Sequence, residues 1–378
     1  MYNVADYGAM IADRVRMDAY ARALRAAITP ESVVLDLGAG TGIFTLLACR
    51  FGARRVYAID PDSALQVARE AAAANGCADR VEFVQASSTE VTLPENVDVI
   101  VSDLRGLLPL FNHHLKSIAD ARRRFLKSGG WLIPQRDTLW AAAVEAPELY
   151  ASVVAGCSED GFDLVAARKF ATQILRKAQL EERHVLLEAQ PWLILDYAIQ
   201  EEGEASGQVT WTAARAGTAH GLALWFETVL AEGIGFSTGP AAPKTIYRQV
   251  FYPWPEPVVL AAGDVVAVAL RANPVGEDYI WRWDTCVRTP AGLPKAEFQQ
   301  STFFGAPLTP ERLRKRASDY VPSLGLEGDI ERFILARMDG ASSLELIARQ
   351  AAERFPQRFA RWEDALGRVS DLSQRYSR

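Results

Sequence analysis

The sequence predicts an α/β domain, an antiparallel β domain and a small helical domain, in that order along 378 residues. Three observations support this fold class. Strand-like apolar runs alternate with helix-length segments up to about residue 140, shorter apolar runs separated by Gly, Pro and Asp follow, and the last part has helical spacing and more charge. Because one hydrophobic core rarely serves so long a chain, we expect domains over 1–138, 139–306 and 307–378.

The first domain is expected to contain a parallel sheet with helices on both faces. Parallel strands need long crossover connections, and helices in those connections cover the sheet. In chain order the pattern predicts helix 9–27, strand 33–37, helix 42–51, strand 56–59, helix 63–75, strand 81–84, strand 97–102, helix 114–126 and a glycine-rich segment at 129–134.

The second domain has the pattern of an antiparallel, barrel-like β structure. Its short apolar runs are 192–195, 209–212, 221–226, 258–260 and 265–270. Residues 162–182 interrupt these runs with a helical pattern, and we expect them to project as an arm. The third domain opens at Leu308-Thr309-Pro310-Glu311, where a threonine cap precedes a proline in the first helical position.

Composition and charge exclude several classes of function. The net charge of −6 provides no basic face for nucleic acid, and no apolar run approaches the length of a membrane span. The four cysteines are scattered without a C-x-x-C pair, so we expect reduced thiols and neither a zinc site nor a disulfide framework. The N-terminus also lacks a basic region followed by a hydrophobic one. These patterns predict a cytoplasmic protein that binds no nucleic acid, membrane or metal.

A glycine turn after the first strand predicts a cofactor site. Gly38, Gly40 and Gly42 form G-x-G-x-G, which lets a ligand approach the backbone where a Cβ would block it. The spacing differs from the G-x-G-x-x-G of dinucleotide sites, in which a pyrophosphate sits at the helix N-terminus. Asp60 ends the second strand, where its carboxylate can accept hydrogen bonds from both ribose hydroxyls. S-adenosylmethionine therefore fits this pattern better than NAD.

Two more acidic residues near strand ends strengthen this interpretation. Asp36 precedes the glycine turn, and Glu90 follows the strand at 81–84. The alternative is an α/β crossover whose glycines serve only the close packing of helix and strand, and that alternative explains a lone glycine turn equally well. The turn and the three acids together favour the cofactor site.

Several segments also carry a family resemblance, namely 10–16, 35–42, 93–103, 126–130 and 235–240. With them, the chain resembles the protein arginine methyltransferase family across most of residues 7–305. The glycine turn is common to related methyltransferases, whereas the segments at 10–16 and 235–240 are more specific. The resemblance implies a seven-stranded, Rossmann-like methyltransferase sheet, a β-barrel substrate domain, S-adenosylmethionine as methyl donor and, through the arm, a homodimer.

The resemblance implies roles on the cofactor side of the site. Arg16 would form a two-pronged pair with the methionine carboxylate of the cofactor. Met10 would pack near the methyl donor, and Glu90 would accept a hydrogen bond from the adenine amino group. The full predicted cofactor set is Met10, Arg16, Asp36, Gly38, Gly40, Gly42, Asp60, Glu90 and Ser102.

On the acceptor side the sequence departs from the family pattern. In the family, a loop after the fourth strand presents two glutamates to the substrate guanidinium. Here Asp103 takes the first position and the neutral Asn112 the second, so one of the two compensating charges is missing. We expect Asp103 to orient or deprotonate the acceptor. The family's Thr-His-Trp run corresponds to Thr245-Ile246-Tyr247, which leaves no histidine to pair with Asp13.

Other side chains near this site have two interpretations each. Tyr247 either hydrogen-bonds the acceptor or packs in the core, and His113 and His114 are either a solvated helix start or a proton acceptor. Only nine residues precede Met10, so we expect little of the family's N-terminal, tyrosine-bearing helix. The predicted catalytic set is Asp103, Asn112, Asp13 and Tyr247.

The C-terminal segment offers a clue to the substrate. An Asp-Gly turn at 339–340 between helical segments resembles the winged-helix modules that bind leader peptides in enzymes that tailor ribosomally made peptides. A plain helical cap or a dimer contact explains the same pattern. A leader-binding module would tether a peptide at a distance from the reacting residue.

Three functions remain open at this point. The first is a methyltransferase acting on arginine or a similar group of a peptide or protein. The second has the same architecture and a different acceptor, such as a small metabolite or a non-guanidino side chain, which Asn112 and Ile246 favour. The third is a cofactor-binding scaffold without activity, which we rank last because the cofactor motifs are intact.

Overall fold

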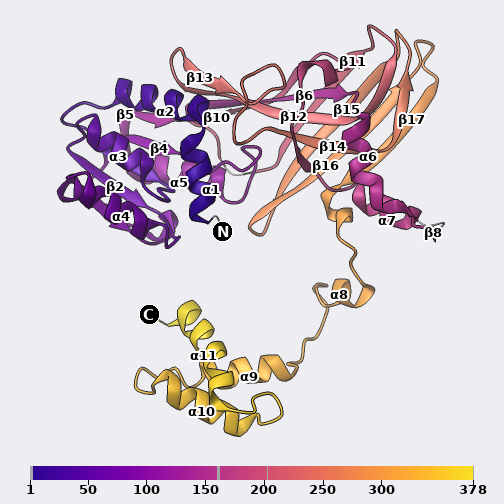
Figure 1. The fold of residues 1–378 in the computed structure, drawn as a ribbon. Helices are drawn as coiled ribbons and strands as arrows, with labels where there is room; N and C mark the ends of the chain where they lie inside the picture. Colours follow the sequence, from indigo (N-terminus) through magenta and orange to yellow (C-terminus); the bar gives the residue numbers. More distant parts are fainter. Residues whose placement is uncertain (1–2, 160–161, 202, 378) are drawn as a thin grey trace. The chain divides into compact units, whose positions relative to one another are not determined.

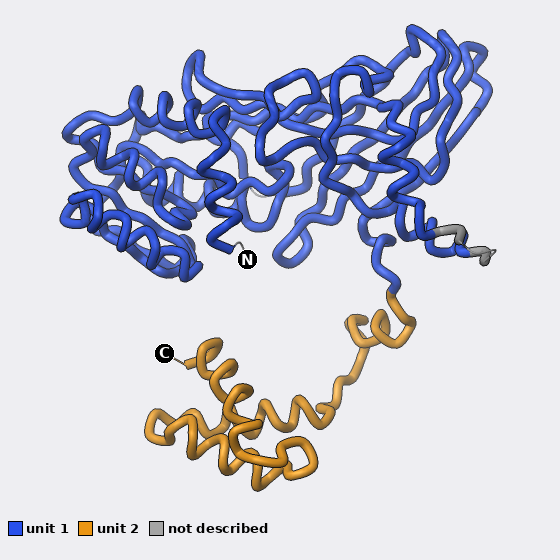
Figure 2. Tube along the Cα trace, viewed as in Figure 1, with its two compact units in different colours: residues 1–307 blue, residues 308–378 orange. Residues whose placement is uncertain are grey.

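The chain forms two compact units, Met1–Pro307 and Leu308–Arg378 (Figure 1, Figure 2). The computed structural model describes residues 3–159, 162–201 and 203–377. The first unit contains the α/β and β parts, and the second contains the terminal helices. The predicted order of an α/β, an antiparallel β and a helical part is confirmed.

The α/β part is built on a five-stranded parallel sheet in the order β3-β2-β1-β4-β5. Its strands are β1 (Val33–Leu37), β2 (Arg55–Ile59), β3 (Val81–Val84), β4 (Val97–Ser102) and β5 (Leu126–Ile133). In the centre of the sheet, Leu35 of β1 lies between Tyr57 of β2 and Ile100 of β4. Every residue of β1 is buried, as expected for a strand with helices over both faces.

Helices cover the two faces of this sheet (Figure 1). Residues of α2 (Arg14–Ala27), α3 (Ile43–Arg50) and α4 (Leu65–Ala74) share one apolar core with one face of the sheet, and α5 (His114–Phe125) shares another core with the opposite face. The helix predicted over 9–27 is broken at Asp13, which ends α1 (Val4–Ala12) in an extended conformation. Its side chain then caps α2 by accepting a hydrogen bond from Arg16 N.

Among the described residues the parallel sheet has five strands and ends at β5, two fewer than the seven that the family resemblance implied. After Ile133 the chain passes through Pro134 and continues as β6 (Arg136–Val144), which pairs with strands of the second sheet. Pro134 has no N–H to extend the parallel ladder. The chain enters the β domain at this point, where two more strands of the α/β sheet were expected.

The β domain consists of two antiparallel sheets. One has the order β10-β6-β12-β14-β9, with β13 beside β12, and the other has the order β11-β15-β16-β17. The strands not yet given are β9 (Arg176–Ala178), β10 (Gln190–Asp196), β11 (Ala205–Thr212), β12 (Gly217–Ala231), β13 (Ile234–Ser237), β14 (Gln249–Leu260), β15 (Val265–Val275), β16 (Asp278–Arg288) and β17 (Pro294–Ser301). Alternate residues of β16, Trp281 and Trp283 among them, are buried in the shared apolar core.

The prediction of a helix over 162–182 is wrong for most of that segment. The only α-helix in it is α7 (Val165–Ala171). It is preceded by α6 (Pro147–Val154) and by the short strands β7 (Ser158–Glu159) and β8 (Phe162–Asp163). The chain then returns to the sheet as β9, which pairs with β14. Ala178 and Leu180 are buried two residues apart, which is the strand period. None of the residues of α7 is buried.

The second unit contains α8 (Pro310–Arg314), α9 (Leu326–Leu335), α10 (Leu344–Arg354) and α11 (Trp362–Tyr376). Its apolar core includes Ile330, Ile334, Ile347 and Val369. Over 308–377 the chain forms helices and loops but no strand, so the hairpin that would form a wing is missing and the winged-helix prediction is wrong. The predicted N-cap is present, because the Thr309 side chain accepts a hydrogen bond from Arg312 N.

In the part of the chain that the structure describes, no helix combines the length and the apolar character needed to cross a membrane.

Candidate active site

The glycine turn after β1 is required by its surroundings. Gly38, Gly40 and Gly42 have φ of +80°, +51° and +82°, which residues with a side chain rarely adopt. A Cβ on Gly38 would lie 2.2 Å from Cδ2 of Leu104, and one on Gly40 would lie 2.4 Å from Cε1 of Tyr7. A Cβ on Gly42 would lie 2.6 Å from that of an alanine in α4. The turn therefore needs glycines for both backbone torsion and close approach.

Asp60 at the end of β2 is held in a defined orientation. Gly40 N donates to Asp60 Oδ2 at 2.8 Å, and Asp62 N donates to Oδ1 at 2.7 Å. Burial raises the pKa of Asp60 above its ordinary value. Each carboxylate oxygen has a second acceptor position, so Asp60 can still accept hydrogen bonds from a ligand in the adjoining cavity.

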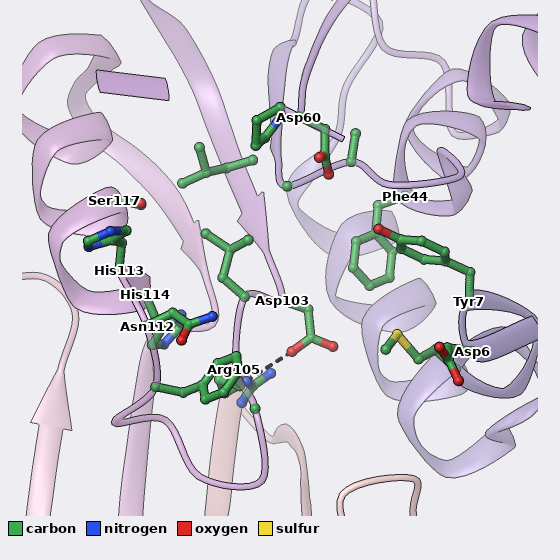
Figure 3. A pocket seen from close by; sticks show the side chains of 18 of the residues that line it. Asp6, Tyr7, Phe44, Asp60, Asp103, Arg105, Asn112, His113, His114 and Ser117 are labelled. Carbon is green, nitrogen blue, oxygen red and sulfur yellow. Dashed lines mark hydrogen bonds and ion pairs between the residues drawn. The ribbon is translucent and has the colours of Figure 1, made fainter. Parts of the chain in front are cut away.

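A cavity of about 650 Å³ lies between the glycine turn, α1, the loop after β4 and the segment at 245–247 (Figure 3). The predicted site residues that line it are Met10, Arg16, Gly38, Asp60, Asp103, Asn112 and Tyr247. The predicted residues outside its lining are Asp13, Asp36, Gly40, Gly42, Glu90 and Ser102. A nucleoside, an amino acid and an acceptor group fit in a cavity of this size.

Three of the predicted cofactor residues that do not line the cavity lie elsewhere: Asp36 and Ser102 are buried next to the turn or the acceptor loop, and Glu90 is exposed. Asp36 accepts a hydrogen bond from Thr45 Oγ1 at 2.6 Å, and burial raises the pKa of Asp36 to about 7. The carbonyl of Ser102 accepts a hydrogen bond from Tyr20 Oη at 3.0 Å. Glu90 is exposed in a 3₁₀ turn and does not reach the cavity wall.

Asp13 connects the α/β part to the β domain. Its Oδ1 accepts a hydrogen bond from Arg16 N at 3.1 Å, and its Oδ2 accepts one from Ile246 N at 2.7 Å. A backbone amide thus takes the place of the histidine that the family resemblance pairs with this aspartate. Asp13 therefore positions Arg16 and the 245–247 segment without lining the cavity.

Asp103 is the centre of the acceptor side. Arg16 Nε lies 2.5 Å from its Oδ2, the Tyr247 hydroxyl donates to the same oxygen, and Arg105 Nε donates to Oδ1 at 3.1 Å. Burial alone would raise the pKa of Asp103, but the guanidiniums of Arg16 and Arg105 outweigh it and lower the pKa to about 2. Asp103 is therefore a fixed anion that can orient a group, and it is a weak proton acceptor.

Arg105 is the functional residue that sequence reasoning missed. Its side chain is fully buried and its Nη1 lies 3.0 Å from Asp137 Oδ1 and 3.0 Å from Thr228 Oγ1. Its Nη2 donates to the Tyr20 hydroxyl. Two signals in the sequence could have indicated the pair of Arg105 and Asp137. One is an arginine two residues after Asp103 in the acceptor loop, and the other is an aspartate at the start of the mostly apolar run 137–144.

The buried network continues from Asp137 to His114. Tyr197 Oη donates to Asp137 Oδ2 at 2.6 Å and lies 2.9 Å from His114 Nε2. Burial and the positive charge of Arg105 lower the pKa of His114 to about 3. His114 is therefore buried and neutral at neutral pH, whereas its neighbour His113 is exposed, and both line the cavity.

Asn112 and Tyr7 lie differently from what the sequence suggested. Asn112 has φ +43° and is exposed at the cavity wall (Figure 3). The second carboxylate beside Arg105 is that of Asp137 on β6, which is fully buried and does not line the cavity. Tyr7 lies on α1, so a tyrosine-bearing helix is present where we expected little of one, and its ring covers Gly40. An Asn3 capping box, which sequence reasoning did not use, starts that helix.

Two family models match adjoining parts of the chain. Residues 20–135 match ribosomal protein L11 methyltransferase. Residues 135–284 match the arginine methyltransferase oligomerization subdomain. The boundary between the two matches coincides with the start of β6.

Curated relatives cover most of the chain. Protein arginine N-methyltransferase 1.1 of Arabidopsis thaliana is 27% identical over 274 residues, which cover 70% of each chain. Protein arginine N-methyltransferase 2 of Homo sapiens is 32% identical over 287 residues, which cover 70% of this chain and 66% of the relative.

Solved structures show the same fold. The Trypanosoma brucei PRMT1 enzyme-prozyme complex with AdoHcy has a TM-score of 0.71 at 22% identity and covers 78% of this chain and 96% of its own. Arabidopsis thaliana protein arginine methyltransferase 10 has a TM-score of 0.70 at 23% identity, and the match covers 79% of this chain and 97% of that one.

The parallel sheet, the glycine turn and Asp60 beside the cavity define a methyltransferase that uses S-adenosylmethionine. More particularly, the chain belongs to the protein arginine methyltransferase-like enzymes, whose oligomerization subdomain corresponds to its β domain. The predictions of enzyme class and of cofactor are confirmed.

Proposed function

We propose that this enzyme transfers a methyl group to a side chain of a peptide or protein bound beside Asp103. The observation that carries the proposal is the position of Asp103, which lines the same cavity as the glycine turn and is fixed by Arg16 and Tyr247. The names of the relatives, which are protein arginine methyltransferases, support a protein substrate.

On the cofactor side, each residue has one task. We infer that the glycine turn and Asp60 bind the nucleoside, and that Arg16 pairs with the cofactor carboxylate. Met10 lines the cavity near Arg16, whose Nη1 donates to the Met10 carbonyl at 3.3 Å. Glu90 does not line the cavity, so its contact with the adenine amino group stays a prediction.

On the acceptor side, the residues need only position and shield the reacting group. The bound cofactor supplies an electrophilic methyl group on a sulfonium, so alignment and exclusion of water contribute most of the catalysis. Asp103 and Tyr247 would orient the acceptor, and Asn112 would contact it at the cavity wall. Asp13 acts indirectly, through the positions of Arg16 and Ile246.

Two classes of acceptor are supported by different observations. The names of the relatives favour arginine. The residues of this chain favour a non-guanidino acceptor, because Asn112 is neutral and Asp103 already pairs with two guanidiniums of the protein itself. A methyl transfer assay separates the two classes.

That assay uses the purified protein with methyl-labelled S-adenosylmethionine, arginine-containing peptides and a cell extract, and locates the label by mass spectrometry. Label on a peptide or protein side chain supports the proposal, and the labelled atom identifies the class of acceptor. Cofactor binding without any transfer would support the scaffold instead.

We also propose a homodimer in the cytoplasm. The matched oligomerization subdomain and the unburied α7 support the dimer, and the free thiols of Cys49, Cys77 and Cys286 support a reducing compartment. Light scattering that showed a monomer at micromolar concentration would contradict the dimer, and cell fractionation tests the location.

A further inference from the structure

Arg105 lies in a binding site that is complete for a guanidinium. Carboxylates flank it on two sides, with Asp103 Oδ1 3.1 Å from Nε and Asp137 Oδ1 3.0 Å from Nη1. Aromatic rings surround its Cζ at 5.0 to 5.9 Å from the ring centroids, and they belong to Tyr20, Phe226, Phe236 and Tyr247. Paired carboxylates and aromatic faces are the features by which proteins bind a guanidinium.

The hydrogen bonds of this site are already used. Asp103 accepts from Arg105, Arg16 and Tyr247, and a carboxylate has about four acceptor positions. A third guanidinium, from a substrate, would need two of them for a bidentate pair. Asp137 is equally committed, to Arg105 and Tyr197.

The charges around the cavity also disfavour a cationic acceptor. Asp103 and Asp137 are balanced by Arg16 and Arg105. Asp137 does not line the cavity; besides Asp103, the carboxylates that line it in the described chain are those of Asp60, beside the glycine turn, and Asp6, on α1. Lys116 and Lys177 line the cavity as well. An additional buried positive charge would therefore lack compensation.

We propose that Arg105 fills the guanidinium subsite from within, so that the methyl acceptor is a group without positive charge. This inference rests on the proposed function, because it names the class of substrate for the same site. It assigns Arg105 as a specificity-determining residue.

A carboxylate acceptor would need no base, but it would have to lie toward Lys116 and Lys177 and away from the anionic Asp103. The acceptor oxygen uses a lone pair to form the new C–O bond as the S–C bond breaks with its electrons going to sulfur, and no proton is released. The lysines at the cavity wall would favour such an anion electrostatically.

The first test is chemical rescue of the Arg105→Ala variant, which leaves two carboxylates around an empty space. We expect a lower midpoint of thermal unfolding than in the wild type, and a saturable rise of that midpoint with methylguanidinium, because a ligand of the folded state stabilises it. The isosteric, neutral methylurea should not raise it. The wild type, whose subsite is filled, should respond to neither compound.

The control variant is Arg282→Ala, which removes an exposed arginine that also pairs with an aspartate. It should show no response to methylguanidinium. If Arg105→Ala does not fold alone, refolding from denaturant in methylguanidinium or methylurea gives the same comparison. Recovery with methylguanidinium only supports the inference, whereas equal recovery with both compounds, or with neither, overturns it.

The second test locates the label that the wild type transfers from S-adenosylmethionine to peptides and to a cell extract. Label on a carboxylate, hydroxyl, thiol or amide supports the inference. Label on a guanidinium, on a lysine amine or on Arg105 itself overturns it while leaving the methyltransferase function intact. Cofactor binding without transfer contradicts the proposed function, and the rescue experiment then still decides whether Arg105 occupies a guanidinium subsite.

Discussion

The Arg16 guanidinium and the Asp103 carboxylate form a buried ion pair, with Nε 2.5 Å from Oδ2. Arg16 lies in the first turn of α2, and Asp103 follows β4 directly. The pair thus joins the residue proposed for the cofactor carboxylate to the residue proposed for the acceptor. Because Arg16 and Asp103 hold each other in place, this one contact between α2 and the end of β4 can align the cofactor with the acceptor.

Replacement of Asp103 by asparagine tests its positioning role. We expect Asp103→Asn to lower kcat by roughly 10²-fold through misalignment of the acceptor, with cofactor affinity near that of the wild type. Calorimetry and steady-state kinetics measure the two quantities. The matched control is Asp284→Asn, which changes a half-buried aspartate that pairs with the exposed Arg282. Unchanged turnover in Asp103→Asn would refute the role.

Removal of Asp137 tests whether its carboxylate compensates the buried positive charge of Arg105. Asp137→Ala leaves a fully buried guanidinium without its main partner, and breaking a buried pair on one side costs about 3–5 kcal/mol of unfolding free energy. Asp284→Ala breaks an exposed pair and should cost no more than about 1 kcal/mol. Denaturant titration compares the two variants, and similar values for both would contradict the buried network.

His114 makes stability depend on pH in a definite direction. In the folded protein the pKa of His114 is lowered to about 3 from 6.5, so the unfolded chain binds a proton that the folded protein does not. The stabilising effect of this neutral histidine is complete above pH 6.5 and decreases as the pH falls below it, by about 1.4 kcal/mol per pH unit.

Unfolding free energies measured between pH 7 and pH 4 test this statement. The slope should be smaller in His114→Gln than in the wild type. An equal slope in His114→Gln and the wild type would show that the histidine is not held neutral.

Two glycines distinguish backbone strain from loss of the cofactor site. Gly40 and Gly76 have φ of +51° and +66°, but a Cβ on Gly40 would meet Tyr7 whereas one on Gly76 would meet nothing within 4 Å. The positive φ should cost each alanine variant about 1–2 kcal/mol of stability, and Gly40→Ala should lose more because its Cβ meets the Tyr7 ring. Only Gly40→Ala should also lose cofactor affinity, by roughly tenfold or more, as measured by calorimetry. Equal affinity in both variants would count against the turn as a binding site.

Local patterns predicted the elements that build the site. Strands 33–37, 81–84 and 97–102 were predicted with the bounds that the structure shows, because β-branched and other apolar residues dominate these short segments. The glycine turn and the acid that ends β2 were also readable from sequence, because the three glycines follow one another closely and Asp60 comes directly after an apolar strand.

Predictions that depended on the family or on distant contacts were less successful. Residues 176–178 were assigned to a helical arm, yet they form β9 because pairing with β14 outweighs a weak helical pattern. The seven-stranded sheet and the winged helix were expected from resemblance, and nothing in the residues themselves required either. Tyr7 was overlooked because its contact with Gly40 is visible only once α1 lies over the turn.

The sequence by itself determined the class of this enzyme: a methyltransferase sheet with a glycine turn, an acid at the end of β2, and a β domain after it. Only the tertiary structure decided the acceptor side, where Arg105 meets Asp137 and, through Tyr197, reaches His114. The reason is physical. Strand and turn preferences act between near neighbours, whereas the balance of buried charges depends on which distant side chains the fold removes from water together.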